Sequence, residues 1–175
     1  YQNNLISFKK NKKLNLIFLK NSNNQIKSIL KLKNKIKKNE KVLILNYDST
    51  FDFNHRKINK NVDGSIYSIK QNELKRNFNP KDVFIEKNNY IKKIFKKKKL
   101  LNIKEKTSAG LYYLKKWSDF LDAAMKIKDL NKRSLHVIDI FIKLIQKKNI
   151  TSEYVDNFMC FDNDNKIEEY KFWKK

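Results

Sequence analysis

The sequence is poor in several residue types, and each shortage narrows the kinds of protein it can encode. Its 175 residues include two glycines, one proline, one cysteine and two histidines. A single cysteine forms no intramolecular disulfide and no cysteine-based metal site, which argues against a secreted disulfide scaffold. Two glycines supply no glycine-rich phosphate loop. We therefore predict no catalytic residue, no metal site and no cofactor, and so a protein that is not an enzyme.

Long hydrophobic runs are also missing. No apolar run approaches the roughly 20 residues of a membrane span. The best candidate, His136–Ile145, is interrupted by Asp139 and Lys143, so no transmembrane segment is expected. A start at Tyr1 is compatible with a targeting segment already removed. Residues 1–40 carry eleven lysines and one acid, which suits an organellar presequence, although their lack of arginine argues against one.

Arginine and alanine are rare as well, and lysine dominates the charge. Residues encoded by GC-rich codons are scarce, while lysine, asparagine and isoleucine abound, which indicates an AT-rich genome. The net charge is +23 at pH 7, and the pI is about 9.9. So large an excess of base predicts a polyanionic partner, of which RNA, DNA and an anionic membrane are the candidates.

The first part of the chain alternates strand-like and helix-like patterns. Apolar runs predict strands, apolar residues at steps of three or four predict helices, and Asp63-Gly64 predicts a hairpin turn. The predicted elements are a strand 14–19, a helix 24–38, a strand 42–47, a strand 65–71 and a helix that begins at Asn79-Pro80 and reaches Phe95. The order is β-α-β-β-α.

The second part is predicted to be helical. Apolar stripes at helical spacing indicate an antiparallel helix pair, Leu111–Leu130 and Leu135–Lys148, followed by a short helix from Thr151. The predicted fold class is therefore α+β, with a small βαββα N-terminal domain and a C-terminal helical extension. Residues 1–106 would form the basic α/β region, and residues 107–175 the extension with an acidic, aromatic tail.

The β-α-β-β-α order over residues 14–99 resembles the thioredoxin-like domain of small mitochondrial ribosomal proteins, the family of large-subunit protein 51 and small-subunit protein 25. The resemblance rests on element order and carries over no functional residue. It implies RNA contact within a ribosome.

The most basic stretch is Ile91–Lys106, with eight lysines in sixteen positions. Lysine is a flexible point charge that suits phosphate oxygens. Together with the lysines near the N-terminus, this stretch is the predicted RNA surface. The candidate RNA-binding residues are Lys9, Lys10, Lys12, Lys13, Lys92, Lys93, Lys96, Lys97, Lys98, Lys99, Lys104 and Lys106.

The C-terminal tail differs in charge from the rest of the chain. Residues 151–175 sum to −2, so phosphate would repel them. Tyr170, Phe172 and Trp173 are aromatic groups of the kind that anchor partner contacts, and they are the candidate protein-docking residues. Cys160 is interpreted as a packed thiol, and His136 as a polar or helix-capping residue.

These observations favour a structural RNA-binding protein of a large ribonucleoprotein. The specific prediction is a mitochondrial ribosomal protein that contacts ribosomal RNA phosphate and neighbouring ribosomal proteins. The alternative is a non-catalytic helical interaction subunit of a membrane-associated complex, with its lysines facing anionic lipid. Basic clusters in separate elements favour the RNA interpretation.

Overall fold

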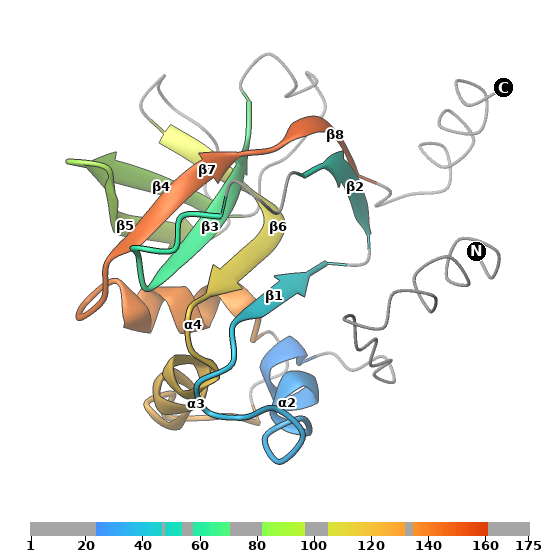
Figure 1. Ribbon diagram of the computed structural model, residues 1–175, viewed down its shortest axis with the longest axis vertical. Helices are drawn as coiled ribbons and strands as arrows, with labels where there is room; N and C mark the ends of the chain where they lie inside the picture. The colour runs from blue at the N-terminus through green and yellow to red at the C-terminus, as the bar shows by residue number, and fades with distance from the viewer. Residues whose placement is uncertain are drawn as a thin grey trace, which may run out of the picture.

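The computed structural model describes residues 24–46, 48–53, 58–70, 82–96, 105–131 and 135–160 (Figure 1). These residues form eight strands and three short helices. The strands are β1 (Val42–Leu45), β2 (Ser49–Asp52), β3 (Gly64–Ile69), β4 (Asp82–Lys87), β5 (Tyr90–Lys96), β6 (Glu105–Leu114), β7 (Ile150–Tyr154) and β8 (Asp156–Cys160). The helices are α2 (Gln25–Leu30), α3 (Trp117–Met125) and α4 (Val137–Leu144).

The main sheet is built around β6. Its strand order is β5-β4-β6-β3-β7, and β1 also pairs with β6. Strands β1, β3 and β4 are antiparallel to β6, and β7 is parallel to β3. Strands β1, β3, β4 and β7 therefore run in one direction, and their carboxyl ends point the same way. Strands β2 and β8 form a separate antiparallel pair.

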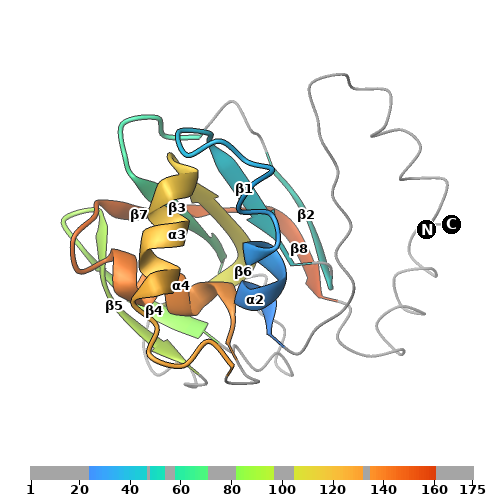
Figure 2. The ribbon, with the colours of Figure 1, turned by 90° about the horizontal axis from the view of Figure 1, so that it is seen from below.

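The three helices cover one face of the main sheet (Figures 1 and 2). Alternate strand residues point toward them, because successive side chains of a strand point to opposite faces. The buried side chains between sheet and helices include Ile66, Phe84, Tyr112, Ile150, Trp117, Phe120, Ile138 and Phe141. The opposite face is also apolar, and the β2–β8 pair contributes to it. Its buried residues are Tyr67, Ile69, Ala109, Leu111, Tyr113 and Val155, with Phe51, Phe53 and Phe158 packed against them.

Helices α2 and α4 begin with side-chain caps. Asn24 Oδ1 accepts a hydrogen bond of 2.9 Å from the backbone N–H of Lys27, which satisfies one of the donors that a helix start leaves unpaired. Asp139 Oδ2 accepts one of 2.9 Å from the backbone N–H of His136. His136 is the residue before α4, so its interpretation as a helix-capping residue is confirmed.

Gly64 does not form the predicted hairpin turn. It is the first residue of β3, where a Cβ atom would lie 2.7 Å from the carbonyl oxygen of Tyr113 on β6. Glycine is needed there for close strand packing and not for a positive φ.

The predicted helix between Pro80 and Phe95 is wrong, because this stretch forms the β4–β5 hairpin. Asn88 and Asn89 make the turn with φ values of 55° and 64°, the left-handed conformation that two-residue hairpin turns require. Phe84 lies opposite Ile94 across the hairpin. Both side chains are apolar because they pair across the two strands. Their spacing in the sequence also fits one face of a helix, so spacing alone does not separate the two structures.

The C-terminal helical extension is also wrong. Leu111–Leu114 belong to β6, and the stretch predicted as a short third helix forms β7 and β8. The α+β fold class with a βαββα domain is thus replaced by a mixed sheet covered on one face by helices. Trp117, Ile138 and Phe141 do share one core, as predicted for the helix pair, whereas Met125 is 75% exposed. The division of the chain at residue 106 stays a prediction, although β6 runs across that point.

The strands predicted at 42–47 and 65–71 are confirmed, and so is a helix within 24–38 and one within 135–148. The strand predicted at 14–19 lies outside the described residues. None of the described helices is long and apolar enough to cross a membrane.

Replacing Phe141 tests whether the helix-covered face is the stabilising core. Its side chain is fully buried, and its ring centroid lies 5.3 Å from that of Tyr112. Phe141→Ala should lower the free energy of unfolding by about 3–5 kcal/mol, because it removes buried apolar contacts and leaves a cavity. Met125→Ala, at a 75% exposed position, should change it by less than about 0.5 kcal/mol. Equal denaturant midpoints for the two variants would contradict this core.

Tyr67 on the opposite face should make the protein sensitive to alkali. Its hydroxyl is buried and has no hydrogen-bond partner within the described residues. Burial, and then the charges of Glu153 and Tyr113, raise the pKa of Tyr67 from 10.0 to about 12. The unfolded chain therefore ionises first, and stability falls as pH rises from 10.0 toward about 12.

Denaturation of Tyr67→Phe and the original protein at a series of pH values measures this effect. The variant should lose less stability over that interval, because it has no phenol to ionise. It should be at least as stable near neutrality, since the hydroxyl makes no hydrogen bond that would be lost. Parallel losses of stability in the two proteins would contradict the assignment.

Candidate functional site

A break in the main sheet lies beside the middle of β6. Strand β3 pairs with one edge of β6 from Thr107 to Leu114. On the other edge, β1 pairs with Leu111–Leu114 and β4 pairs with Glu105–Thr107. The described strands therefore leave Ser108–Gly110 without a neighbouring strand on that edge. The break lies at the carboxyl end of β1, where open α/β sheets bind ligands.

Gly110 shapes this break. From Tyr112 to Ser108, four steps along β6 lie opposite the two steps from Ile66 to Ser68 on β3, so β6 bulges. The bulge depends on the φ of +78° at Gly110, a conformation that glycine adopts without strain.

The bulge holds Asn46, the first residue after β1. The backbone N–H of Asn46 donates to the carbonyl oxygen of Gly110 at 2.9 Å. A Cβ atom on Gly110 would lie 2.8 Å from Nδ2 of Asn46, so the amide side chain occupies the space that glycine leaves open. The backbone N–H of Gly110 donates to Ser108 Oγ at 3.1 Å. Polar groups of β1 and β6 thus meet at the break.

Several charged groups act on the buried hydroxyl of Tyr112. Ser108 Oγ donates to it at 3.2 Å. Burial raises the pKa of Tyr112, and the carboxylates of Asp82, Asp48 and Asp139 raise it further, while the Ser108 hydrogen bond lowers it. The phenol stays neutral at physiological pH. Because the phenol oxygen accepts the hydrogen bond from Ser108, the phenol O–H group can donate to another oxygen.

The three carboxylates come from three different elements. Asp48 follows β1, Asp82 begins β4, and Asp139 lies in the first turn of α4. Lys96 pairs in register with Asp82, and its Nζ lies 2.9 Å from both carboxylate oxygens of Asp139. We call Asn46, Asp48, Asp82, Lys96, Ser108, Gly110, Tyr112 and Asp139 the polar cluster.

The polar cluster combines groups with complementary chemistry. Amide and hydroxyl groups hydrogen-bond to hydroxyls of a sugar or polyol, and carboxylates bind hard divalent cations. The described residues contain no group of three or more acidic, cysteine or histidine side chains arranged for a metal ion. A cation held here by one or two carboxylates would take its remaining oxygens from water and substrate phosphates, which is how Mg²⁺ is usually bound.

The candidate lysines do not share one surface. Lys92 and Lys93 are exposed on β5, and their Nζ atoms lie 5.6 Å from the ring centroid of Tyr90 and 4.9 Å from that of Phe95. Lys96 belongs to the polar cluster, and Lys106 Nζ lies 2.5 Å from Glu86 Oε2. The remaining candidates lie outside the described residues: Lys9, Lys10, Lys12, Lys13, Lys97, Lys98, Lys99 and Lys104, with Tyr170, Phe172 and Trp173.

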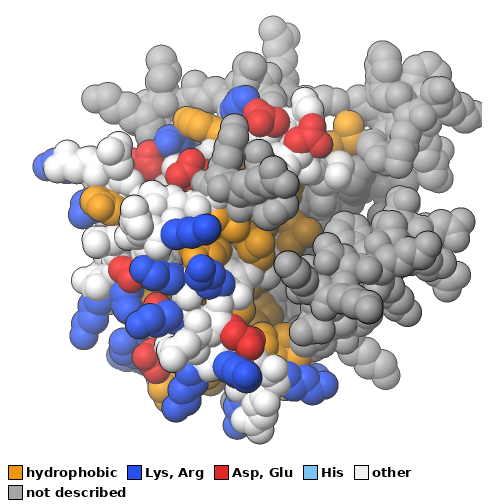
Figure 3. All heavy atoms as spheres, in the orientation of Figure 1, with side chains coloured by type: hydrophobic (Ala, Val, Ile, Leu, Met, Phe, Trp, Pro, Cys, Tyr) orange, Lys and Arg blue, Asp and Glu red, His pale blue; other side chains and the backbone are white. Residues whose placement is uncertain are grey.

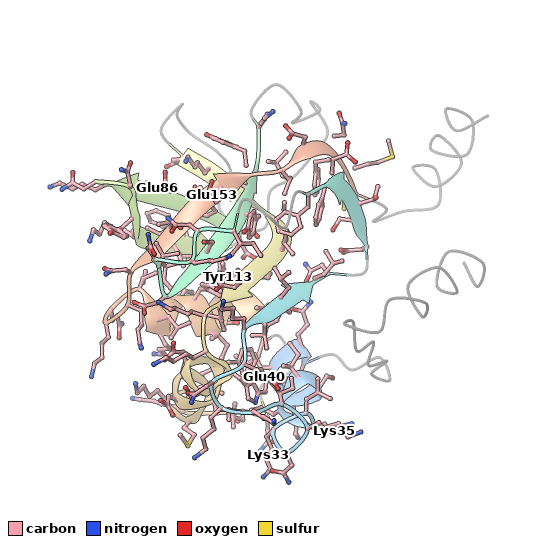
Figure 4. The ribbon with its side chains drawn as sticks, viewed as in Figure 1. Lys33, Lys35, Glu40, Glu86, Tyr113 and Glu153 are labelled. Carbon is pink, nitrogen blue, oxygen red and sulfur yellow. The ribbon has the colours of Figure 1, made fainter. Side chains whose placement is uncertain are left out.

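A second charged group lies around Lys106, away from the break. Lys106 also donates to Ser152 Oγ at 2.9 Å, and Glu86 Oε1 accepts from the backbone N–H of Ser152 at 3.0 Å. Figure 4 shows Glu86 and Glu153 close together here. Burial, and then the charge of Glu86, raise the pKa of Glu153, while Lys106 lowers it. These partners satisfy one another and tie β4 and β6 to β7, so this group is structural.

The sequence interpretation did not identify Asn46, Asp48, Ser108, Gly110 or Tyr112. One signal for them is present in the sequence: polar Asn46-Tyr47-Asp48 follows an apolar strand directly. Polar residues at such a strand end are placed for ligand binding when the strands are parallel. The break in β6 has no such signal, because it depends on which strands pair.

Comparison with known proteins gives a fold but no family. No protein-family model matches the chain, and no curated protein matches it in sequence. Solved structures do match. A nucleoside-diphosphate-sugar pyrophosphorylase from Vibrio cholerae is similar with a TM-score of 0.69 and 15% identity, over 97% of this chain and 76% of that one.

Two further structures belong to the same functional group. A Bacillus anthracis protein assigned as a glucose-1-phosphate thymidylyltransferase is similar with a TM-score of 0.68 and 12% identity, over 99% of this chain and 72% of that one. The inositol-1-phosphate CTP transferase of T. maritima is similar with a TM-score of 0.58 and 13% identity, over 87% of this chain. The match spans 62% of that transferase, which is less than two thirds of its length.

These likenesses correct the ribosomal interpretation. The fold is that of nucleotidyltransferase structures and not of thioredoxin-like ribosomal proteins. The predictions of a structural RNA-binding protein, of ribosomal RNA and ribosomal protein partners, and of a protein that is not an enzyme are wrong on this ground. The alternative of a non-catalytic helical subunit is wrong too, since the described residues form eight strands and three short helices. The mitochondrial location is untested.

Gly110→Ala tests the geometry of the break. The φ of +78° disfavours alanine, and its Cβ would contact Asn46, so the free energy of unfolding should fall by about 1–3 kcal/mol. The double variant Asn46→Ala/Gly110→Ala should lose less than the sum of the two single changes, because no amide remains for the Cβ to meet. Additive losses in denaturant titrations, or an unaffected single variant, would contradict the described bulge.

Proposed function

We propose that the protein is a nucleotidyltransferase that acts on the phosphate of a sugar or polyol. The observation that carries the proposal is the polar cluster at the carboxyl end of β1, on a fold shared over nearly the whole chain with sugar-phosphate and inositol-phosphate nucleotidyltransferases. The identities of 12–15% support the fold, and the reaction is our inference.

The reaction of this class is a phosphoryl-centred displacement. An oxygen of the sugar or polyol phosphate attacks the α-phosphorus of a nucleoside triphosphate. The bond between the α-phosphorus and the bridging oxygen breaks, and pyrophosphate leaves. Catalysis of such a step is mainly positioning and stabilisation of phosphate charge.

Each part of the polar cluster has a role in this scheme. Ser108 and Asn46 bind and orient the hydroxyl-bearing substrate, because they provide neutral donors and acceptors around the break, and the buried Tyr112 hydroxyl positions Ser108 by accepting its hydrogen bond. Lys96, held by Asp139, adds one positive charge on the same side of the sheet.

A divalent cation fits these residues. Asp48 and Asp82 both raise the pKa of Tyr112, so the charges of both carboxylates act on this hydroxyl. Asp48, with oxygens of the substrate phosphates, would hold Mg²⁺. The ion would neutralise phosphate charge when bound.

The direct test is pyrophosphate release from nucleoside triphosphates in the presence of Mg²⁺ and a panel of sugar and inositol phosphates. Release that requires both substrates would support the proposal. Absence of release with every pair, together with absence of triphosphate binding in calorimetry, would overturn it.

Asp48→Asn tests the assigned site within the active protein. It should lower kcat by about 10²–10³-fold, a loss typical of removing one charge-stabilising group. It should also weaken Mg²⁺-dependent triphosphate binding. The matched control is Asp52→Asn, four residues along, because Asp52 is exposed on β2 and is not one of the carboxylates that raise the pKa of Tyr112. Similar rates for the two variants would remove Asp48 from the site while leaving the reaction class intact.

A further inference from the structure

Exposed lysines gather at the opposite end of β1 from the polar cluster. The loop between α2 and β1 covers residues 31–41 and contains six lysines and one acid, Glu40. Figure 3 shows lysine side chains over the lower part of the molecule, and Figure 4 shows Lys33 and Lys35 projecting from this end. Lys116, which precedes α3, is exposed beside them. We call Lys33, Lys35, Lys37, Lys38, Lys41 and Lys116 the basic face.

The backbone under the basic face is held in place. The backbone N–H groups of Trp117 and Ser118, at the start of α3, donate to the carbonyl oxygens of Glu40 and Lys38, both at 2.8 Å. Trp117 itself is buried in the core. The lysines of the loop and of the α3 start therefore form one continuous surface.

The charge of the basic face is not neutralised within the described residues. Among the described residues, Lys70, Lys96, Lys106 and Lys148 form ion pairs, and the lysines of the basic face do not. Glu40 accepts a hydrogen bond of 3.3 Å from the backbone N–H of Lys37. Six like charges so close together repel one another, so an anionic partner that lies across them is favoured.

The chemistry of the surface indicates which polyanion it fits. All six residues are lysines, which act as point charges toward phosphate oxygens. The basic face contains no aromatic side chain on which a nucleic-acid base could stack. Figure 2 shows α2, the loop that follows it and α3 on one side of the molecule.

We propose that the basic face binds the surface of a membrane that contains anionic phospholipids. The lysines contact lipid phosphates and carboxylates. Since the polar cluster lies at the other end of β1, an enzyme bound in this way keeps its site open to soluble substrates. The proposal does not depend on the reaction proposed above.

Vesicle flotation tests this surface. The full chain is mixed with vesicles of phosphatidylcholine alone, or of phosphatidylcholine with phosphatidylserine, at increasing salt. The protein should float only with the vesicles that contain phosphatidylserine, and increasing salt should release it from them. The variant Lys33→Gln/Lys35→Gln/Lys37→Gln/Lys38→Gln should bind them at least about tenfold more weakly.

A matched variant separates the surface from the overall charge. Lys60→Gln/Lys87→Gln/Lys92→Gln/Lys93→Gln removes the same four charges from exposed positions elsewhere. It should keep binding to within about threefold, because distant charges are screened. Equal losses in the two variants would overturn the proposal, and so would failure of the original protein to float.

Two further measurements complete the test. Thermal melts of both variants should match that of the original protein, since all eight lysines are exposed. Both proteins are also titrated with a structured RNA. If the original protein binds RNA tightly and does not bind vesicles, and the basic-face variant loses the RNA binding, the partner is a nucleic acid. That result would overturn the proposal.

Discussion

Strand β6 has two edges, and this limit determines the architecture around it. Strand β3 takes one edge along most of its length, so β1 and β4 must share the other. They meet it at opposite ends and leave Ser108–Gly110 between them. The interruption in pairing thus becomes the place where the backbone of β6 meets Asn46.

Glycine makes this arrangement possible at small cost. At Gly110 the positive φ bends β6, and the absent Cβ admits the side chain of Asn46. The chain has two glycines, and at both positions a Cβ atom would lie too close to a neighbouring group. At Gly64 this group is the carbonyl oxygen of Tyr113 on β6. A larger residue at either position would push strands apart or displace the amide.

Charge has two distinct uses in this molecule. Half-buried lysines tie elements together: Lys96 joins β5 to α4 through Asp139, and Lys106 joins β6 to β4 through Glu86. Exposed lysines of the basic face have no such partner among the described residues and present their charge outward. Lysine content alone does not separate these uses. The lysines predicted as one binding surface therefore have different places in the structure: Lys96 belongs to the polar cluster, Lys106 forms a structural ion pair, and Lys92 and Lys93 are exposed on a hairpin.

The wrongly predicted helices have one common cause, which is that a local apolar pattern does not show which segments pair. The apolar residues Phe84 and Ile94 fit a helical face, yet they are partners across a hairpin whose turn, Asn88-Asn89, carries a recognisable signal for positive φ. Leu111 and Leu114 extend the apolar stripe of α3 in sequence but belong to β6. A short run of apolar residues is compatible with a buried strand or a helix, and tertiary pairing selects between them.

By itself the sequence determined the local elements with strong patterns. These are the strands at Val42–Leu45 and Gly64–Ile69, helix α2, which follows a run of capping residues that ends at Asn24, and helix α4. Only the tertiary structure decided which strands share β6, and hence where the sheet breaks. The polar cluster joins residues from positions 46 to 139, and the basic face joins a loop to the start of α3. Such contacts depend on long-range pairing between segments, and no local pattern of side chains records them.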